Sequence, residues 1–149
     1  MNLYETIDQE IKAAMKAKDK MRLETLRSAK TAFMEVTTAK GAEHTLTEEQ
    51  AVAILQRMVK QRKDSATIFG EQNRTELAQK ELEEVEILQS YLPKPYTQEE
   101  LDRAIGEIIV KTGSSSLKDM GKVMGAATKD FGGRAEGRMI ADTVKKLLS

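Results

Sequence analysis

The sequence predicts an all-α protein, in which an N-terminal four-helix domain is joined by a proline linker to a C-terminal three-helix domain. Apolar residues recur at helical spacing from the first turn onward, and no segment shows the alternating pattern of a strand. Aromatic residues make up only 4% of the 149 residues, which is unlike a β-sandwich. Pro93 and Pro95 form the one boundary signal in the chain. We therefore expect domains at 1–92 and 98–149, with a linker at 93–97.

The first two helices follow from two apolar stripes. The first stripe fades into the charged residues 16–20, which we expect to form a turn. The second stripe ends at residues 37–41, where β-branched residues and a glycine stop the helix. The stripes consist of Leu3, Ile7, Ile11 and Ala14, and then of Leu23, Leu26, Lys30, Phe33 and Val36.

The third and fourth helices are predicted from a capping box and from two further stripes. Thr47 and Gln50 have the spacing at which each side chain satisfies a free backbone N–H of the first turn. Gly70 is expected to cap the C-terminus of this third helix, and a fourth helix is expected from Thr75 to Tyr91 with a solvated acidic face. The stripes are Val52, Leu55, Val59, the stem of Arg62, Ala66 and Phe69, and then Ala78, Leu82, Val85, Leu88 and Leu92.

Three more helices are predicted after the prolines. A second capping box, Thr97 with Glu100, begins the fifth helix, which ends at Gly113. The sixth helix begins near Ser116 and is broken by the glycines at 132–133, and the seventh runs from about 136 to 148. Their stripes are Leu101, Ile105, Ile108 and Ile109, then Met120, Val123, Met124 and Ala127, and finally Ile140, Val144, Leu147 and Leu148.

Composition limits the function. The 24 Lys and Arg balance the 24 Asp and Glu, so an electrostatic partner must be met by a local patch rather than by a global field. The absence of Cys removes thiol nucleophiles and thiolate metal sites, and the single His44 is expected at the surface. We therefore expect no catalytic residue, no cofactor and no metal. No long apolar run and no signal-peptide pattern is present, so we expect a cytoplasmic protein without a membrane partner.

The loop before the seventh helix has the composition of an anion site. Its glycines and basic residues suggest a P-loop, but the preceding strand, the Lys and the Ser or Thr of that motif are missing. A glycine-rich loop entering a helix still offers free N–H groups and the positive end of the helix dipole. Gly133, Arg134, Gly137 and Arg138 form this candidate site, with both arginines expected to be exposed. The alternative is that the glycines only permit a tight reversal of the chain.

A second candidate surface lies on the sixth helix. Gly121 and Gly125 are four positions apart, so they leave one strip of the helix without side chains. Either another helix of the fold or a nucleic-acid backbone can approach such a strip closely. Lys122 and Lys129 lie near it, and residues 111–149 hold eight basic against four acidic side chains. This local excess is the strongest electrostatic signal for a nucleic-acid partner.

Three separated motifs resemble a known family. The stretches 120–124 (MGKVM), 133–137 (GRAEG) and 144–148 (VKKLL) resemble the C-terminal signature of the GatB/YqeY family. Residues 21–27 (MRLETLR) and 88–93 (LQSYLP) are similar to the N-terminal half of its stand-alone members. The resemblance covers nearly the whole chain, and its motifs occur in the order that the family has.

The resemblance implies a role beside tRNA. In that family a similar domain is the tail of the B subunit of the glutamine-dependent amidotransferase that acts on misacylated tRNA, and it is also appended to some glutaminyl-tRNA synthetases. The tail binds tRNA, while catalysis lies in other domains and subunits. The resemblance therefore implies a tRNA-binding accessory protein. An association with carbon–nitrogen ligase chemistry that uses glutamine as amide donor follows from the family alone, and autonomous enzyme activity is not expected.

Two readings of the function stay open at the level of the sequence. In the first, tRNA contacts the glycines and cations of the C-terminal helices, namely Gly121, Lys122, Gly125, Lys129, Gly133, Arg134, Gly137 and Arg138. In the second, the chain is an adaptor that docks on an aminoacyl-tRNA synthetase or amidotransferase without touching RNA. The basic C-terminal excess and the resemblance favour RNA, whereas the neutral net charge and the scarcity of aromatic stacking platforms favour the adaptor.

Overall fold

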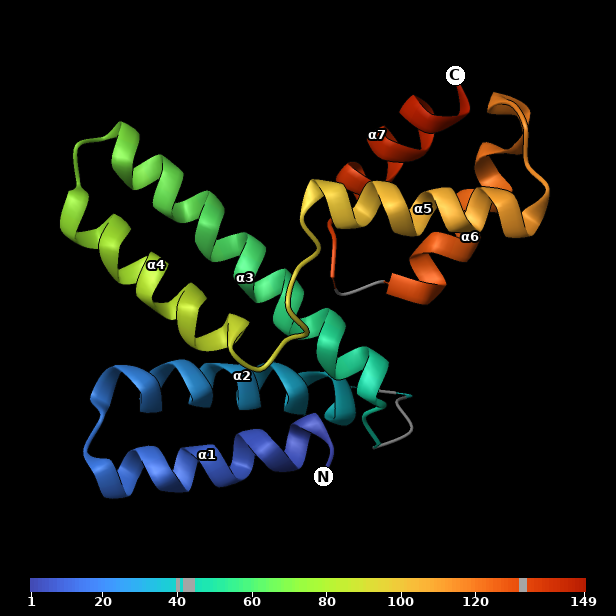
Figure 1. Ribbon diagram of the computed structural model, residues 1–149. Helices are drawn as coiled ribbons and strands as arrows, with labels where there is room; N and C mark the ends of the chain where they lie inside the picture. Colours follow the sequence, from blue (N-terminus) through green and yellow to red (C-terminus); the bar gives the residue numbers. More distant parts are fainter. Residues whose placement is uncertain (40, 42–44, 132–133) are drawn as a thin grey trace. The chain divides into compact units, whose positions relative to one another are not determined.

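The computed structural model describes residues 1–39, 41, 45–131 and 134–149, and these residues form seven α-helices, one short 3₁₀ turn and no β-strand (Figure 1). The all-α prediction is confirmed, while His44 and Gly133 lie outside the described residues. Within the same residues, no helix is both long and apolar enough to cross a membrane. The elements are α1 Leu3–Ala17, α2 Lys20–Thr38, α3 Glu48–Glu71, α4 Thr75–Gln89, α5 Gln98–Thr112, the 3₁₀ turn η1 Leu117–Asp119, α6 Met120–Phe131 and α7 Gly137–Leu148.

Local signals explain where most helices begin and end. Both capping boxes are present: the Thr47 hydroxyl accepts from the Gln50 amide at 3.1 Å, and the Thr97 hydroxyl accepts from the Glu100 amide at 3.1 Å. Gly113 takes the left-handed conformation, with φ of 67°, and thereby ends α5 as predicted. Because these signals act within one turn of the chain, they require no knowledge of the tertiary fold.

The contacts divide the chain into two compact units, Met1–Leu92 and Pro93–Ser149. The first contains α1 to α4 and the second contains α5 to α7. Residues 93–97, which were expected to form a separate linker, thus fall inside the second unit. The reason is tertiary, because the Tyr96 backbone N–H donates to the Arg134 carbonyl at 2.7 Å and the Tyr96 side chain packs against the second core.

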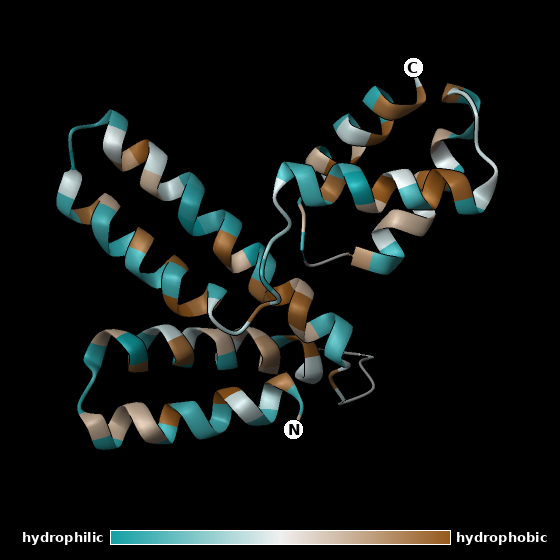
Figure 2. Cartoon of the chain, viewed as in Figure 1, coloured by the Kyte–Doolittle hydropathy of each residue, from teal (hydrophilic) through white to brown (hydrophobic). Residues whose placement is uncertain are grey.

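The N-terminal unit is built around one apolar core. In Figure 2 its helices carry both hydrophobic and hydrophilic residues, as amphipathic helices do. Glu48 at the start of α3 accepts the Leu3 backbone N–H with both carboxylate oxygens, at 2.9 and 3.2 Å, and so fixes the start of α1. The core residues are Leu3, Ile7, Leu26, Ala29, Phe33, Ala51, Ile54, Leu55, Met58, Val59, Val85 and Leu88.

Two details of the α3–α4 hairpin correct the prediction. Gly70 lies inside the last turn of α3 rather than capping it, and the left-handed residue of the reversal is Asn73, with φ of 58°. Asn tolerates this conformation better than most residues, so the chain can turn three positions later than predicted. Leu82, predicted to be apolar core, is 45% exposed, because Val85 and Leu88 form the buried side of α4.

The acidic face of α4 is also less solvated than predicted. Glu84 keeps only 16% of its side chain exposed and lies 3.8 Å from Nε of Arg62, whose side chain is 17% exposed. The Arg62 stem was expected to be buried with its charge in water, yet the guanidinium is mostly buried too. An ion pair therefore joins the two helices of the hairpin.

The C-terminal unit has its own apolar core. Polar contacts on its rim join α5 to α7: Gln98 donates to the Thr143 hydroxyl at 3.0 Å, and Lys146 pairs with Asp102 at 3.0 Å. Hydrogen bonds from Gln98 and then from Lys146 lower the pKa of the Asp102 carboxyl. The core residues are Leu101, Ile105, Ile108, Val123, Ala127, Phe131, Ile140, Val144 and Leu148.

Candidate nucleic-acid interface in the C-terminal unit

The glycine strip of α6 faces open space. Gly121 and Gly125 are both exposed, and a Cβ atom added at either position would meet no described atom within 4 Å. Val123 and Ala127, by contrast, are buried in the core. The alternative that another helix of the fold approaches this strip is therefore wrong for the described residues. At these two positions the helix surface therefore carries no side chain and is open to solvent.

Lys122, beside this strip, has a structural contact that the sequence did not indicate. Its Nζ donates to the Thr112 carbonyl at 3.0 Å, at the C-terminal end of α5. The last carbonyls of a helix have no partner within the helix, and a cation there also interacts favourably with the helix dipole. An ammonium carries three donors, so this contact leaves Lys122 able to bind an external phosphate as well.

Arg134 is not the freely exposed arginine that was expected. Its guanidinium carbon lies 3.9 Å from the centroid of the Tyr96 ring, and its Nε donates to the Lys94 carbonyl at 2.9 Å. The side chain is half-buried as a result. The expectation of exposure is wrong, because the sequence does not show that residues 94–96 pack beside the α6–α7 loop.

Arg138 and Gly137 form the first turn of α7. Arg138 is exposed and has no hydrogen-bond or ion-pair partner among the described residues. Gly137 is exposed too, and a Cβ atom there would meet nothing within 4 Å. The N-cap residue Glu136 makes no capping hydrogen bond through its side chain, so the first-turn N–H groups lack the cap that starts most helices.

The sequence left open that the glycines before α7 only permit a tight reversal of the chain, and Gly137 bears on this alternative. Gly137 does not take a positive φ, so its backbone does not require a glycine. Gly133, the other glycine of the candidate loop, lies outside the described residues.

Lys129, in the last turn of α6, is exposed and has no partner among the described residues.

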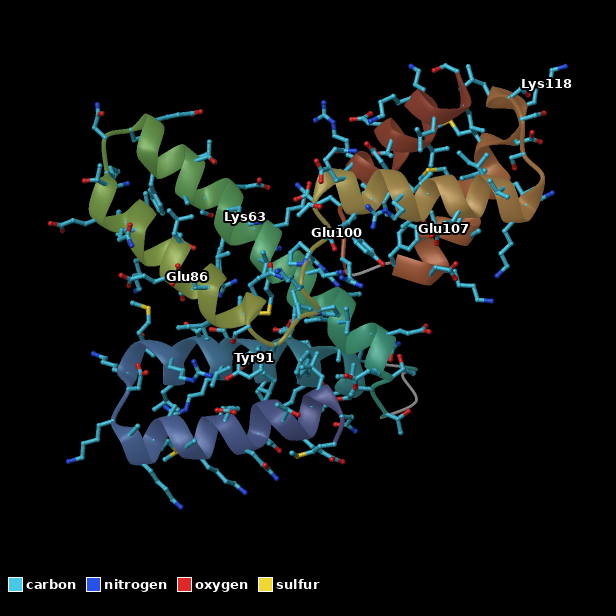
Figure 3. All side chains as sticks on the ribbon, viewed as in Figure 1. Lys63, Glu86, Tyr91, Glu100, Glu107 and Lys118 are labelled. Atoms are coloured by element: carbon cyan, nitrogen blue, oxygen red, sulfur yellow. The ribbon has the colours of Figure 1, made fainter. Side chains whose placement is uncertain are left out.

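An acidic residue limits the basic surface at the start of α5. Figure 3 labels Glu100 there and Glu107 further along the same helix. Hydrogen bonds from the backbone and side chain of Thr97 lower the pKa of the Glu100 carboxyl, and the charges of Arg134 and Lys94 lower it further. Glu100 is thus held in its charged form, so phosphate contacts are expected on α6 and α7 rather than at this end of α5.

The sequence predicts neither a catalytic site nor a metal site, and we find no candidate for either among the described residues. Within the ranges that the structure describes, no group of three His, Asp or Glu side chains is placed to hold a metal ion. A shallow hollow on the outer side of α4 is lined by Thr75, Glu76, Gln79, Lys80 and Glu83. The absence of catalysis, cofactor and metal stays a prediction.

Comparison with known proteins identifies a family and a relative of this chain. The family model described as Yqey-like protein matches residues 4–148. A protein of Clavispora lusitaniae, "Altered inheritance of mitochondria protein 41, mitochondrial", is 37% identical over 90 residues, which is 60% of this chain and 51% of that protein. The chain thus spans about half the length of this curated relative.

Proposed function

Because the chain belongs to the YqeY-like family, we propose that it is a tRNA-binding accessory protein whose C-terminal unit contacts the RNA backbone. The observation that carries this proposal is the open glycine strip of α6, flanked by cations. Gly121 and Gly125 let a ribose–phosphate chain approach the helix backbone, while Lys122 and Lys129 supply charge beside it. Arg138 adds, at the start of α7, a guanidinium that has no partner among the described residues.

The aromatic residues of the unit favour contacts to phosphate over base stacking. Tyr96 has the Arg134 guanidinium over its ring and the Phe131 ring against it at 5.4 Å, in an edge-to-face arrangement. Phe131 itself is buried. Single-stranded RNA is usually held by stacking on exposed aromatic rings, whereas paired RNA is recognised by its backbone and shape. We therefore infer a paired region of tRNA as the contacted part.

The adaptor alternative is favoured by a different observation. Val110 is 82% exposed, Leu117 is 48% exposed and Leu147 is 38% exposed, and all three lie in the C-terminal unit. Exposed aliphatic side chains of this kind suit a protein partner such as a synthetase or an amidotransferase better than they suit RNA. In this reading, binding depends on these apolar residues and only weakly on salt.

The experiment is filter binding of total tRNA to the full chain at several salt concentrations. Each lost phosphate contact is expected to lower the slope of log affinity against log salt by about 0.7 to 0.9. We expect this for Lys122→Ala, Lys129→Ala and Arg138→Ala. Lys145→Ala is the matched control, because it removes the same charge from an exposed position in the last turn of α7.

Two results would contradict the RNA proposal. One is the absence of tRNA binding at low salt. The other is a variant lacking Lys122, Lys129 and Arg138 together that binds with its salt slope intact. Either result favours the adaptor, and a Leu117→Ser variant that then lost its protein partner would support that alternative directly.

A further inference from the structure

We propose that residues 93–97 form a strap that Arg134 latches onto the C-terminal unit, and that opening of this latch lengthens the free connection between the two units. In Figure 1 the stretch that leads into α5 runs beside the stretch that leads into α7, both within the C-terminal unit. The strap and its latch consist of described residues, and they do not depend on whether the partner of the protein is RNA or another protein.

Arg134 holds the strap by three contacts. Its Nε donates to the Lys94 carbonyl at 2.9 Å, and its guanidinium lies over the Tyr96 ring at 3.9 Å. Its own carbonyl accepts the Tyr96 N–H at 2.7 Å. A hydrogen bond from a charged donor is stronger than one from a neutral donor, and a cation over an aromatic face adds a further attraction. Arg134 thus supplies both hydrogen bonds and the cation–π contact that hold Lys94 and Tyr96 in place.

The strap is suited to be held in this way. Pro93 and Pro95 have no backbone N–H and a fixed φ, so the segment cannot continue a helix and loses little conformational freedom when it becomes ordered. The Tyr96 ring also meets Phe131, which is only 6% exposed, so the latch is built against the core of the unit. Thr97, the last residue of the strap, is fixed to α5 because its hydroxyl caps that helix.

The latch determines how much chain is free between the units. Leu92 packs against the core of the N-terminal unit, and the Lys94 carbonyl is held by Arg134. When the strap is latched, Pro93 is therefore the one residue between the two held positions. When it opens, the chain is free up to Thr97, and three additional residues extend the reach by about 10 Å at roughly 3.3 to 3.6 Å per residue.

The latch gives Arg134 a role that differs from the predicted one. The sequence suggested that this arginine binds phosphate, whereas in the latch its guanidinium holds the strap in place. Arg138, which lies in the first turn of α7, is exposed and has no such contact among the described residues, so it serves as a matched comparison. Replacing either arginine removes one positive charge from the same end of the unit, but only Arg134 touches the strap.

The experiment measures strap opening in the full chain. Hydrogen exchange of the Tyr96 amide by NMR reports the latch directly, and chymotrypsin cleavage after Tyr96 reports it independently. We expect Arg134→Ala to raise both rates by about ten- to a hundredfold, since it removes a charged hydrogen bond and a cation–π contact. Arg134→Lys keeps the charge but not the planar guanidinium, so an intermediate increase is expected. Arg138→Ala is expected to leave both rates unchanged.

The amide of Val144, which is fully buried in α7, separates strap opening from unfolding of the unit. We expect its exchange to stay at the wild-type rate in Arg134→Ala. Equal acceleration at Tyr96 and Val144 would overturn the proposal, because the strap would then have no motion of its own. Wild-type rates at Tyr96 in Arg134→Ala, or in Arg134→Lys, would overturn the assignment of the latch to the guanidinium.

Discussion

The ion pair between Arg62 and Glu84 is expected to stabilise the outer half of the α3–α4 hairpin. The side chains are 17% and 16% exposed, and the Arg62 Nε has no hydrogen-bond partner among the described residues. In the part of α3 that follows Val59, Ala66 is the one buried residue. In the part of α4 that precedes Val85, no residue is buried. With so little buried apolar surface in this half, the loss of one charge should be measurable. We therefore consider the substitution Glu84→Gln, which keeps the volume and removes the charge.

The distance of 3.8 Å between Arg62 Nε and the Glu84 carboxylate determines how strongly the two charges attract each other. Two unit charges at that separation attract by about 4 kcal/mol at an effective dielectric constant of 20. Desolvation of both groups offsets much of this attraction, yet removing one partner of a fully buried pair still costs about 3 to 5 kcal/mol. About a sixth of each side chain stays exposed here, and Arg62 keeps a hydrogen bond to the Met58 carbonyl at 3.3 Å. We expect Glu84→Gln to lower the free energy of unfolding of this hairpin by about 1 to 3 kcal/mol.

Hydrogen exchange of the hairpin amides is the suitable assay, because the two units need not unfold in one transition. Glu86→Gln is the matched control, since Glu86 lies on the same helix (Figure 3) and is exposed. Its expected effect is within about 0.5 kcal/mol. A double variant, Arg62→Met with Glu84→Leu, removes both charges and should be close to wild type in stability.

Two results would refute this reasoning. If Glu84→Gln costs no more than Glu86→Gln, the pair contributes no more than an ordinary exposed charge. If the double variant is as unstable as the single one, packing of the two side chains rather than charge pairing stabilises the hairpin. Measuring Arg62→Met alone would complete a double-variant cycle and give the interaction energy between the two side chains.

Three further predictions concern the core, the pH dependence and the chemistry. Phe33→Ala, at a position with no exposure in the N-terminal core, should cost about 3 to 5 kcal/mol in urea unfolding, and a cost below 1 kcal/mol would contradict the packing. Because the pKa of Glu100 is lowered, this carboxylate stabilises the fold above pH 4.5, and the stabilisation is lost as the pH falls through the lower folded-state pKa. NMR titration of the Glu100 carboxyl should therefore give a midpoint below 4.5. Thr97→Ala, which removes the hydroxyl that bonds to Glu100, should raise this midpoint. The isolated chain should neither hydrolyse glutamine nor activate a tRNA-bound carboxylate with ATP, as assays of ammonia and ADP can test. The sequence offers no Cys, only one His that could activate a Ser or Thr nucleophile, and no P-loop.

The candidate interface was predictable in part. The strip at Gly121 and Gly125 follows from the spacing of the two glycines on a helix, and its exposure agrees with the buried side that Val123 and Ala127 define. The engagement of Lys122 was not predictable, because the carbonyl that it binds lies ten residues earlier in another helix. Such a contact depends on the angle between two helices, which hydrophobic periodicity does not specify.

The sequence by itself determined the helices and most of their ends. Apolar spacing selects the buried side of each helix, and a cap such as Thr47 or Thr97 acts on an amide three residues away, so both signals are local. The buried side is set only approximately, as the exposed Leu82 shows, because the packing of α4 decides which of its apolar residues are covered.

Only the tertiary structure decided which polar groups meet across the helices. Arg62 and Glu84 are 22 positions apart, and Arg134 and Lys94 are 40 positions apart. The same side chains could equally have been solvated in another packing of the same helices. An arginine therefore becomes an ion-pair partner or a latch only when the fold places an acceptor within reach, since a hydrogen bond or close ion pair forms within about 3 to 4 Å and fails beyond it.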